Sequence, residues 1–121
     1  MSDKRLGKVA SVDLFIEDHG LLTLYVMLDF GGSTQGFGGF ALDEWSKEDD
    51  RRVGTAAGLD LVLQLLALFG VNRLDEIKGR TVYALRDDKD GWNDPIAGLE
   101  LPAFDGGRVF SVDAWRKRWY S

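Results

Sequence analysis

The sequence predicts an α+β fold, in which an antiparallel meander of about five β-strands is packed by one main α-helix and followed by a short C-terminal helix. Two runs near the N-terminus alternate apolar and polar side chains with the period of strands, and one central run has the helical period. Short alternating runs separated by turn residues follow that helix. At 121 residues the chain fits a single domain, residues 1–121, with one core.

The first two strands are predicted as a β-hairpin. Residues 8–16 alternate, and residues 21–30 resume the same period after a tight turn at residues 17–20. A third antiparallel strand is expected over residues 35–42, after a turn at residues 31–34. Alternation then puts Gly36, Gly38, Phe40 and Leu42 on one face, which is expected to lie close against the main helix. Phe37, Gly39 and Ala41 lie on the opposite face, where Phe37 is expected to be exposed.

The main helix is predicted from Thr55, a capping residue, to a stop at Gly70. It follows residues 43–52, whose mixed charges and lack of apolar rhythm indicate a surface loop. One apolar stripe of the helix is expected to face the sheet: Leu59, Val62, Leu63, Leu66 and Phe69. A second stripe is expected to need another cover, either a second copy of the chain or the C-terminal helix: Leu61, Leu65 and Leu68.

The C-terminal third is predicted as short elements. In chain order these are a helical turn at 73–78, a strand at 80–86, a loop at 87–95, a strand at 96–101, an edge segment at 108–110 and a terminal helix. Trp115 and Trp119 share one face of that helix, where they are expected to close the core. The interleaved basic residues 116–118 also allow a nucleic-acid stacking site, which the sequence favours less.

The amino-acid composition excludes several classes of function. The absence of cysteine excludes disulfides, thiolate catalysis and cysteine-based metal sites, and it fits a reducing cytoplasm. The net charge of −5 argues against direct nucleic-acid binding but allows the chain to compete for a basic groove. The N-terminus lacks the apolar core of a signal peptide, and no apolar run is long enough to span a membrane. The expected location is therefore the cytoplasm.

Residues 29–42 hold five of the fifteen glycines between two apolar runs. Such a density requires a geometric reason, which is either packing and turn geometry or the close approach of a ligand or partner. Neither familiar nucleotide fingerprint is present. The candidate ligand-binding or partner-binding residues are Ser33, Thr34, Gln35 and Phe37.

A second candidate group surrounds the first predicted turn. Glu17 and His19 lie in that turn, and the return of the third strand is expected to bring Asp43 and Glu44 towards it. Histidine and carboxylates can serve acid–base or metal chemistry, but a turn-stabilising role is favoured because this histidine is the only one. No residue set forms a catalytic apparatus, so no catalytic residue, metal or cofactor is predicted.

Three motifs carry a resemblance to a known family: Glu-Asp-His-Gly at 17–20, Leu-Asp-Phe-Gly-Gly at 28–32 and Gln-Gly-Phe-Gly-Gly-Phe-Ala-Leu-Asp at 35–43. Together they resemble a family of small proteins encoded by phages and prophages. The likeness covers residues 12–70, whereas the C-terminal third matches less closely. It implies a viral or mobile-element accessory protein that works in the cytoplasm of a bacterial host.

Two functions are compatible with these features. The first is a non-catalytic accessory binding protein, for example a counter-defence inhibitor of the anti-CRISPR kind, whose partner is a bacterial protein. The second is a small-ligand or nucleotide-binding protein, or an enzyme acting on such a ligand, with the glycine-rich stretch 31–39 lining the site.

Overall fold

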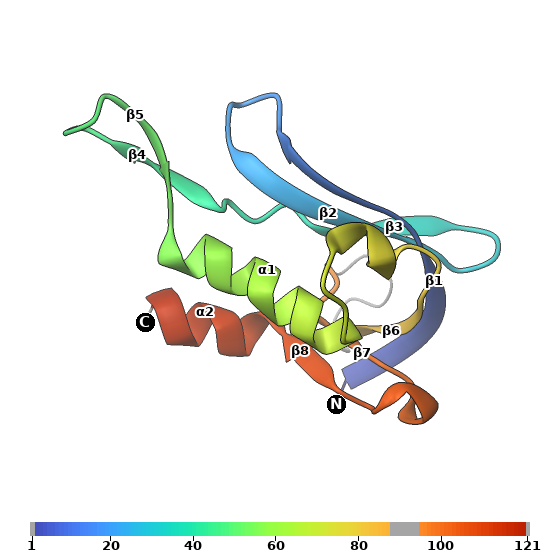
Figure 1. Ribbon diagram of the computed structural model, residues 1–121. Coiled ribbons are helices and arrows are strands. Elements are labelled where there is room, and N and C mark those ends of the chain that lie inside the picture. Colours follow the sequence, from blue (N-terminus) through green and yellow to red (C-terminus); the bar gives the residue numbers. More distant parts are fainter. Residues whose placement is uncertain (1, 88–94, 121) are drawn as a thin grey trace.

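The computed structural model describes residues 2–87 and 95–120, which form an α+β fold (Figure 1). The main sheet has six antiparallel strands in the order β3-β2-β1-β6-β7-β8, and β4 and β5 form a second, two-stranded sheet. The main sheet thus has one strand more than predicted. The elements are β1 (Ser2–Ile16), β2 (Leu22–Asp29), β3 (Thr34–Gly38), β4 (Asp43–Ser46), β5 (Arg51–Gly54), α1 (Ala56–Phe69), η1 (Leu74–Ile77), β6 (Thr81–Asp87), β7 (Gly98–Glu100), η3 (Ala103–Asp105), β8 (Val109–Ser111) and α2 (Val112–Tyr120).

Strand β1 is the centre of the sheet and begins earlier than predicted. Its residues 8–16 pair with β2, while its residues 2–8 pair with β6. The register shifts between Val9 and Ser11, and an irregularity of this kind bends a strand and increases its twist. The two halves of the sheet therefore curve around one core. Their edge strands approach each other so closely that the rings of Phe37 on β3 and Phe110 on β8 are 6.0 Å apart.

Helix α1 has the predicted ends. The hydroxyl of Thr55 accepts a hydrogen bond of 2.9 Å from the N–H of Gly58, and Gly70 ends the helix in the left-handed conformation with φ of 65°. Gly58 is required by packing, because a Cβ there would collide with the backbone of Leu42. The first turn of the helix can therefore lie directly against the chain that leaves β3.

The predicted inner face of α1 is partly wrong: Phe69 is buried and Val62 packs against the core as expected, but the other members of the stripe do not lie innermost. Leu61, Leu65 and Leu68 are buried in the core, whereas Leu59 and Leu63 are 65% and 56% exposed. The helix is apolar around most of its circumference, so its periodicity does not determine which stripe meets the sheet. Since the three leucines are buried within one chain, they cannot form the proposed homodimer contact.

Helix α2 packs beside α1, as Figure 1 shows. The indole N–H of Trp115 donates to the carbonyl oxygen of Ala57 at 2.9 Å, and that of Trp119 donates to the carboxylate of Asp60 at 2.8 Å. Two tryptophans at helical spacing thus close the core, as predicted. The predicted elements between α1 and α2 are also present, except that residues 88–94 of the predicted loop lie outside the described residues.

The predicted burial of the two β3 faces is wrong, although Phe37 and Gly36 do lie on opposite faces. Phe37 pairs with Val26 and is 1% exposed, whereas Gly36 lies on the other face, against the ring of Tyr25. The strand ends at Gly38, and Gly38 and Gly39 both have positive φ, so the alternation of faces stops there. Leu42 is buried in the core and Phe40 packs against it, and neither residue shares a face with Gly36.

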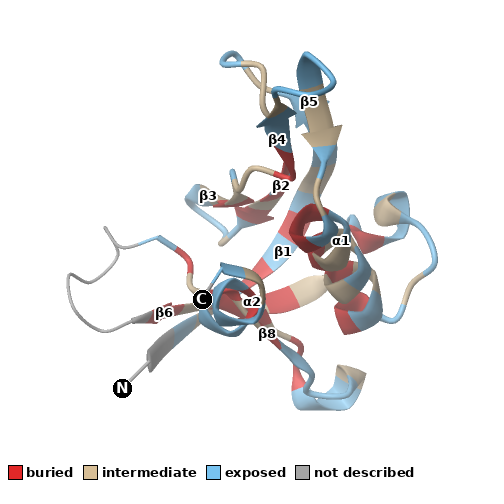
Figure 2. Ribbon diagram, turned by 90° about the vertical axis from the view of Figure 1, so that its left-hand side faces the viewer, coloured by how far each residue is buried: buried red, intermediate tan, exposed pale blue. Residues whose placement is uncertain are grey.

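Residues 43–52 form most of a β-hairpin, not the predicted loop. Its ladder joins β4 to β5, from Asp43 paired with Gly54 to Ser46 paired with Arg51. Figure 2 shows that this hairpin projects away from the body of the protein, as does the turn between β1 and β2. Neither helix that the structure describes has the length and apolar character needed to cross a membrane.

Candidate functional site

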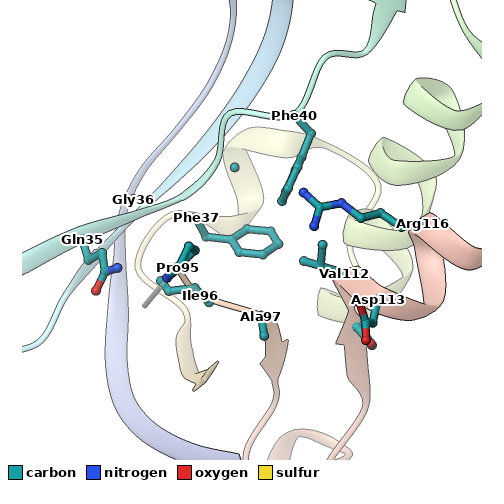
Figure 3. A pocket seen from close by; sticks show the side chains of 12 residues that line it. Gln35, Gly36, Phe37, Phe40, Pro95, Ile96, Ala97, Val112, Asp113 and Arg116 are labelled. Carbon is teal, nitrogen blue, oxygen red and sulfur yellow. The ribbon is translucent and has the colours of Figure 1, made fainter. Parts of the chain in front are cut away.

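The four candidate residues of the glycine-rich stretch separate into two groups. Ser33 and Thr34 are exposed at the turn between β2 and β3. Gln35 and Phe37 line a cavity of about 610 Å³ between β3 and the β8–α2 junction (Figure 3). The structure therefore brings two of the four candidates to one cavity, although Phe37 is a buried wall residue and not the exposed contact that was expected.

The other walls of this cavity come from distant parts of the chain. The described residues that line it are Gln35, Gly36, Phe37, Gly38, Phe40, Pro95, Ile96, Ala97, Ser111, Val112, Asp113 and Arg116. The sequence places Arg116 only in the basic run 116–118 of the terminal helix. Its place at the cavity depends on the curvature that brings the two sheet edges together, and no local pattern in the sequence encodes that approach.

The Glu17 and His19 pair stabilises its turn. The carboxylate of Glu17 accepts hydrogen bonds from the backbone N–H groups of His19 and Leu21, at 2.6 and 3.2 Å, and lies 3.1 Å from Nδ1 of His19. The hydrogen bond with the His19 side chain is the main cause of the lowered pKa of Glu17, and the backbone hydrogen bonds act in the same direction. The histidine ring is otherwise exposed. Within the described residues, no three acidic or histidine side chains gather as a metal site would require.

Asp43 forms a two-pronged ion pair with Arg52 across the β4–β5 hairpin. Nε of Arg52 is 2.8 Å from one carboxylate oxygen, and a terminal nitrogen is 2.9 Å from the other. The Arg52 hydrogen bonds lower the pKa of Asp43, whose side chain is 8% exposed, and the Asp43 hydrogen bond raises the pKa of Arg52. This pair fixes the base of the hairpin. Asp43 is therefore a structural residue, and neighbouring Glu44 is exposed.

We expect Asp43→Asn to lower the free energy of unfolding by about 1–3 kcal/mol at pH 7, because Arg52 loses a charged partner. The pKa of Asp43 is lower in the folded protein than its ordinary value of 3.8, so the ion pair contributes its full stability at pH values above 3.8. This contribution is lost as the pH falls through the pKa of Asp43 in the folded protein. The variant should therefore lose less stability than the wild type between pH 5 and pH 2 in urea titrations. Glu44→Gln is the matched control, and an equal effect of both substitutions would contradict the role of the pair.

The turn of the first hairpin and the β4–β5 hairpin together form an acidic surface, which we term the acidic hairpin end and define as residues 13–19 and 43–52. It carries eight carboxylates and three basic side chains, a net charge of −5 that equals the formal charge of the whole chain. The backbone N–H of Leu42 donates to the carbonyl oxygen of Leu22 at 2.9 Å, which places Asp43 at the His19 end of the first hairpin, as predicted. Figure 1 shows both hairpins leaving the body on the same side.

Apolar side chains are exposed within the acidic hairpin end. Trp45 on β4 is 56% exposed, and Leu14 and Ile16 at the end of β1 are about as accessible. Phe15 stacks on Tyr25 on the other face of the same strands, with ring centroids 5.9 Å apart. Exposed aromatic and aliphatic groups next to concentrated charge are typical of a surface that meets a partner.

Comparisons with known proteins assign no relative to this chain. It matches no protein-family model, no curated protein and no solved structure.

Proposed function

We propose that the protein is a non-catalytic accessory protein of the phage or prophage type that binds and inhibits a bacterial protein complex, as counter-defence proteins of the anti-CRISPR kind do. The observation that supports this proposal most strongly is the acidic hairpin end, where a net charge equal to that of the whole chain is concentrated on two projecting hairpins. Its partner is a protein with a basic groove of the kind that binds nucleic-acid phosphates.

Electrostatics favours this mode of binding. Clustered carboxylates on projecting hairpins attract a basic surface over a distance of about a Debye length and accelerate association. After contact, Trp45 and Ile16 can be buried against the partner, because both side chains are exposed in the free chain. The acidic hairpin end therefore combines charge that directs approach with apolar area that stabilises the complex.

The charge contribution can be tested with two matched double variants. Glu48→Gln/Asp49→Asn neutralises two exposed carboxylates at the tip of the β4–β5 hairpin, and Asp75→Asn/Glu76→Gln neutralises two exposed carboxylates at η1. Proteins captured from a nuclease-treated bacterial lysate by the immobilised wild-type chain would be purified and titrated with each variant. We expect the hairpin variant to bind about 2–30-fold more weakly and the η1 variant to bind like wild type.

The same titration includes a competitor. Duplex DNA should displace the wild-type chain from a captured protein that has a basic groove, and added salt should weaken the complex. The proposal would be contradicted if both double variants bound equally well, or if neither duplex DNA nor added salt weakened the captured complex.

A second candidate function is the binding or conversion of a small ligand or nucleotide at the glycine-rich stretch 31–39. The cavity that Gln35 to Gly38 line is the observation that favours it, because its volume of about 610 Å³ lies in the usual range for ligand sites.

A further inference from the structure

The cavity beside β3 has a preformed aromatic wall. The ring of Phe37 packs edge-on against Phe40 and Phe110, with centroids 5.9 and 6.0 Å apart, and the ring of Phe40 is 5.5 Å from that of Trp115. Each ring is held by its neighbours in a fixed orientation. Ile96 and Val112 are buried side chains that extend this apolar wall, while the rest of the cavity surface is largely polar. A flat apolar group can therefore enter the cavity without the wall having to rearrange.

A cation, the guanidinium group of Arg116, lies at this wall. The guanidinium of Arg116 lies over the ring of Phe40, 5.3 Å from its centroid, and Figure 3 shows it directed from α2 towards Phe40 and Phe37. No ion pair joins Arg116 to a carboxylate among the residues that the structure describes. In the same view the carboxylate of Asp113 lies on the other side of Val112 from the guanidinium. The charge of Arg116 is therefore available to a ligand.

We propose that this cavity binds a small organic monoanion with a flat apolar body, such as an aromatic carboxylate. The apolar body lies against Phe37, Phe40 and Ile96, and the anionic group pairs with the guanidinium of Arg116. A planar guanidinium suits a carboxylate because it can donate two parallel hydrogen bonds. The cation–π contact with Phe40 holds Arg116 where it can do so.

The charges of the lining favour a monoanion over a nucleotide. Among the described residues of the lining, Arg116 is the only cation and Asp113 contributes one carboxylate, so a polyphosphate would face one counter-charge and one like charge from them. Phosphate sites normally use several cations or a run of backbone N–H groups. This inference concerns the second candidate function and does not depend on the inhibitor proposal, because the cavity and the acidic hairpin end share no residue.

A pair of fluorescent probes separates the charge from the apolar body. The anion 1-anilinonaphthalene-8-sulfonate and its neutral analogue N-phenyl-1-naphthylamine share one aromatic framework, and each would be titrated into the full-length protein. We expect one saturable site for the sulfonate. Arg116→Gln should weaken sulfonate binding by about 5–20-fold and change binding of the neutral probe by less than about twofold.

Two further variants make the test specific. Arg118→Gln removes a cation of the same helix that lies over Trp119 and does not line the cavity, so it should leave both affinities unchanged. Ala97→Phe fills the cavity and should abolish binding of both probes, with thermal unfolding used to verify that each variant is folded. The proposal is overturned if Arg116→Gln and Arg118→Gln act alike, if folded Ala97→Phe still binds the sulfonate, or if wild type binds neither probe.

Discussion

Replacing Phe37 with alanine should lower the free energy of unfolding by about 3–5 kcal/mol, the usual scale for truncating a buried aromatic residue. The ring is 1% exposed and packs between Phe40 and Phe110, so its removal leaves a void between the two edge strands of the sheet. Urea unfolding measures this loss of stability. An unchanged slope of the unfolding free energy against urea concentration would show that the substitution does not alter the surface exposed on unfolding.

Gln35→Ala is the internal control for this expectation. Gln35 occupies the same strand two residues earlier and is half-buried, so its truncation should change stability by no more than about 0.5 kcal/mol. The buried position of Phe37 would be refuted if its alanine variant were as stable as the Gln35 variant. In that case the ring would face solvent, which is what alternation through residues 35–42 predicted.

Local signals account for the parts of the fold that the sequence predicts correctly. A capping threonine and a C-terminal glycine define α1 because each satisfies backbone groups at a helix end within a few residues. The first hairpin follows from two alternating runs and a short turn. The tryptophan pair of α2 also depends on local spacing, since i and i+4 share a helix face.

Features determined by tertiary contacts were not predictable in the same way. Helix α1 has apolar residues on two stripes, and only the packed sheet decides that Leu65 is buried and Leu63 exposed. The β4–β5 hairpin lacks an apolar rhythm because it projects from the body, and the Asp43–Arg52 ion pair holds its base. A charged sequence that reads as a loop can therefore be an ordered pair of strands.

The candidate cavity could be predicted only in part. The glycine density indicated the stretch that contains β3, and two of its candidate residues, Gln35 and Phe37, line the cavity. Ile96 and Arg116 come from the opposite edge of the sheet, and their approach depends on the bend in β1 between Val9 and Ser11. No spacing in the sequence connects these positions, so the cation of the site was assigned a different role.

Gly38→Ala should lower the free energy of unfolding by about 2–5 kcal/mol, for a reason other than close packing against α1. Gly38 has φ of 137°, where an L-residue with a side chain is strained, and an added Cβ would collide with the carbonyl oxygen of Leu24. That carbonyl is fixed because it accepts a hydrogen bond of 3.2 Å from Gly39.

Two other glycines isolate these causes in the same thermal and urea unfolding experiments. Gly36 has no positive φ, and a Cβ there meets only the Tyr25 and Met27 side chains, so Gly36→Ala should cost less than Gly38→Ala. Gly54 has neither a positive φ nor a neighbouring atom in the way, so alanine there should be neutral or stabilise by up to about 1 kcal/mol. Tolerance of alanine at Gly38 equal to that at Gly54 would refute the left-handed end of β3. Equal losses of stability in Gly36→Ala and Gly38→Ala would instead favour the predicted arrangement, in which both glycines share one face of the strand and pack against the main helix.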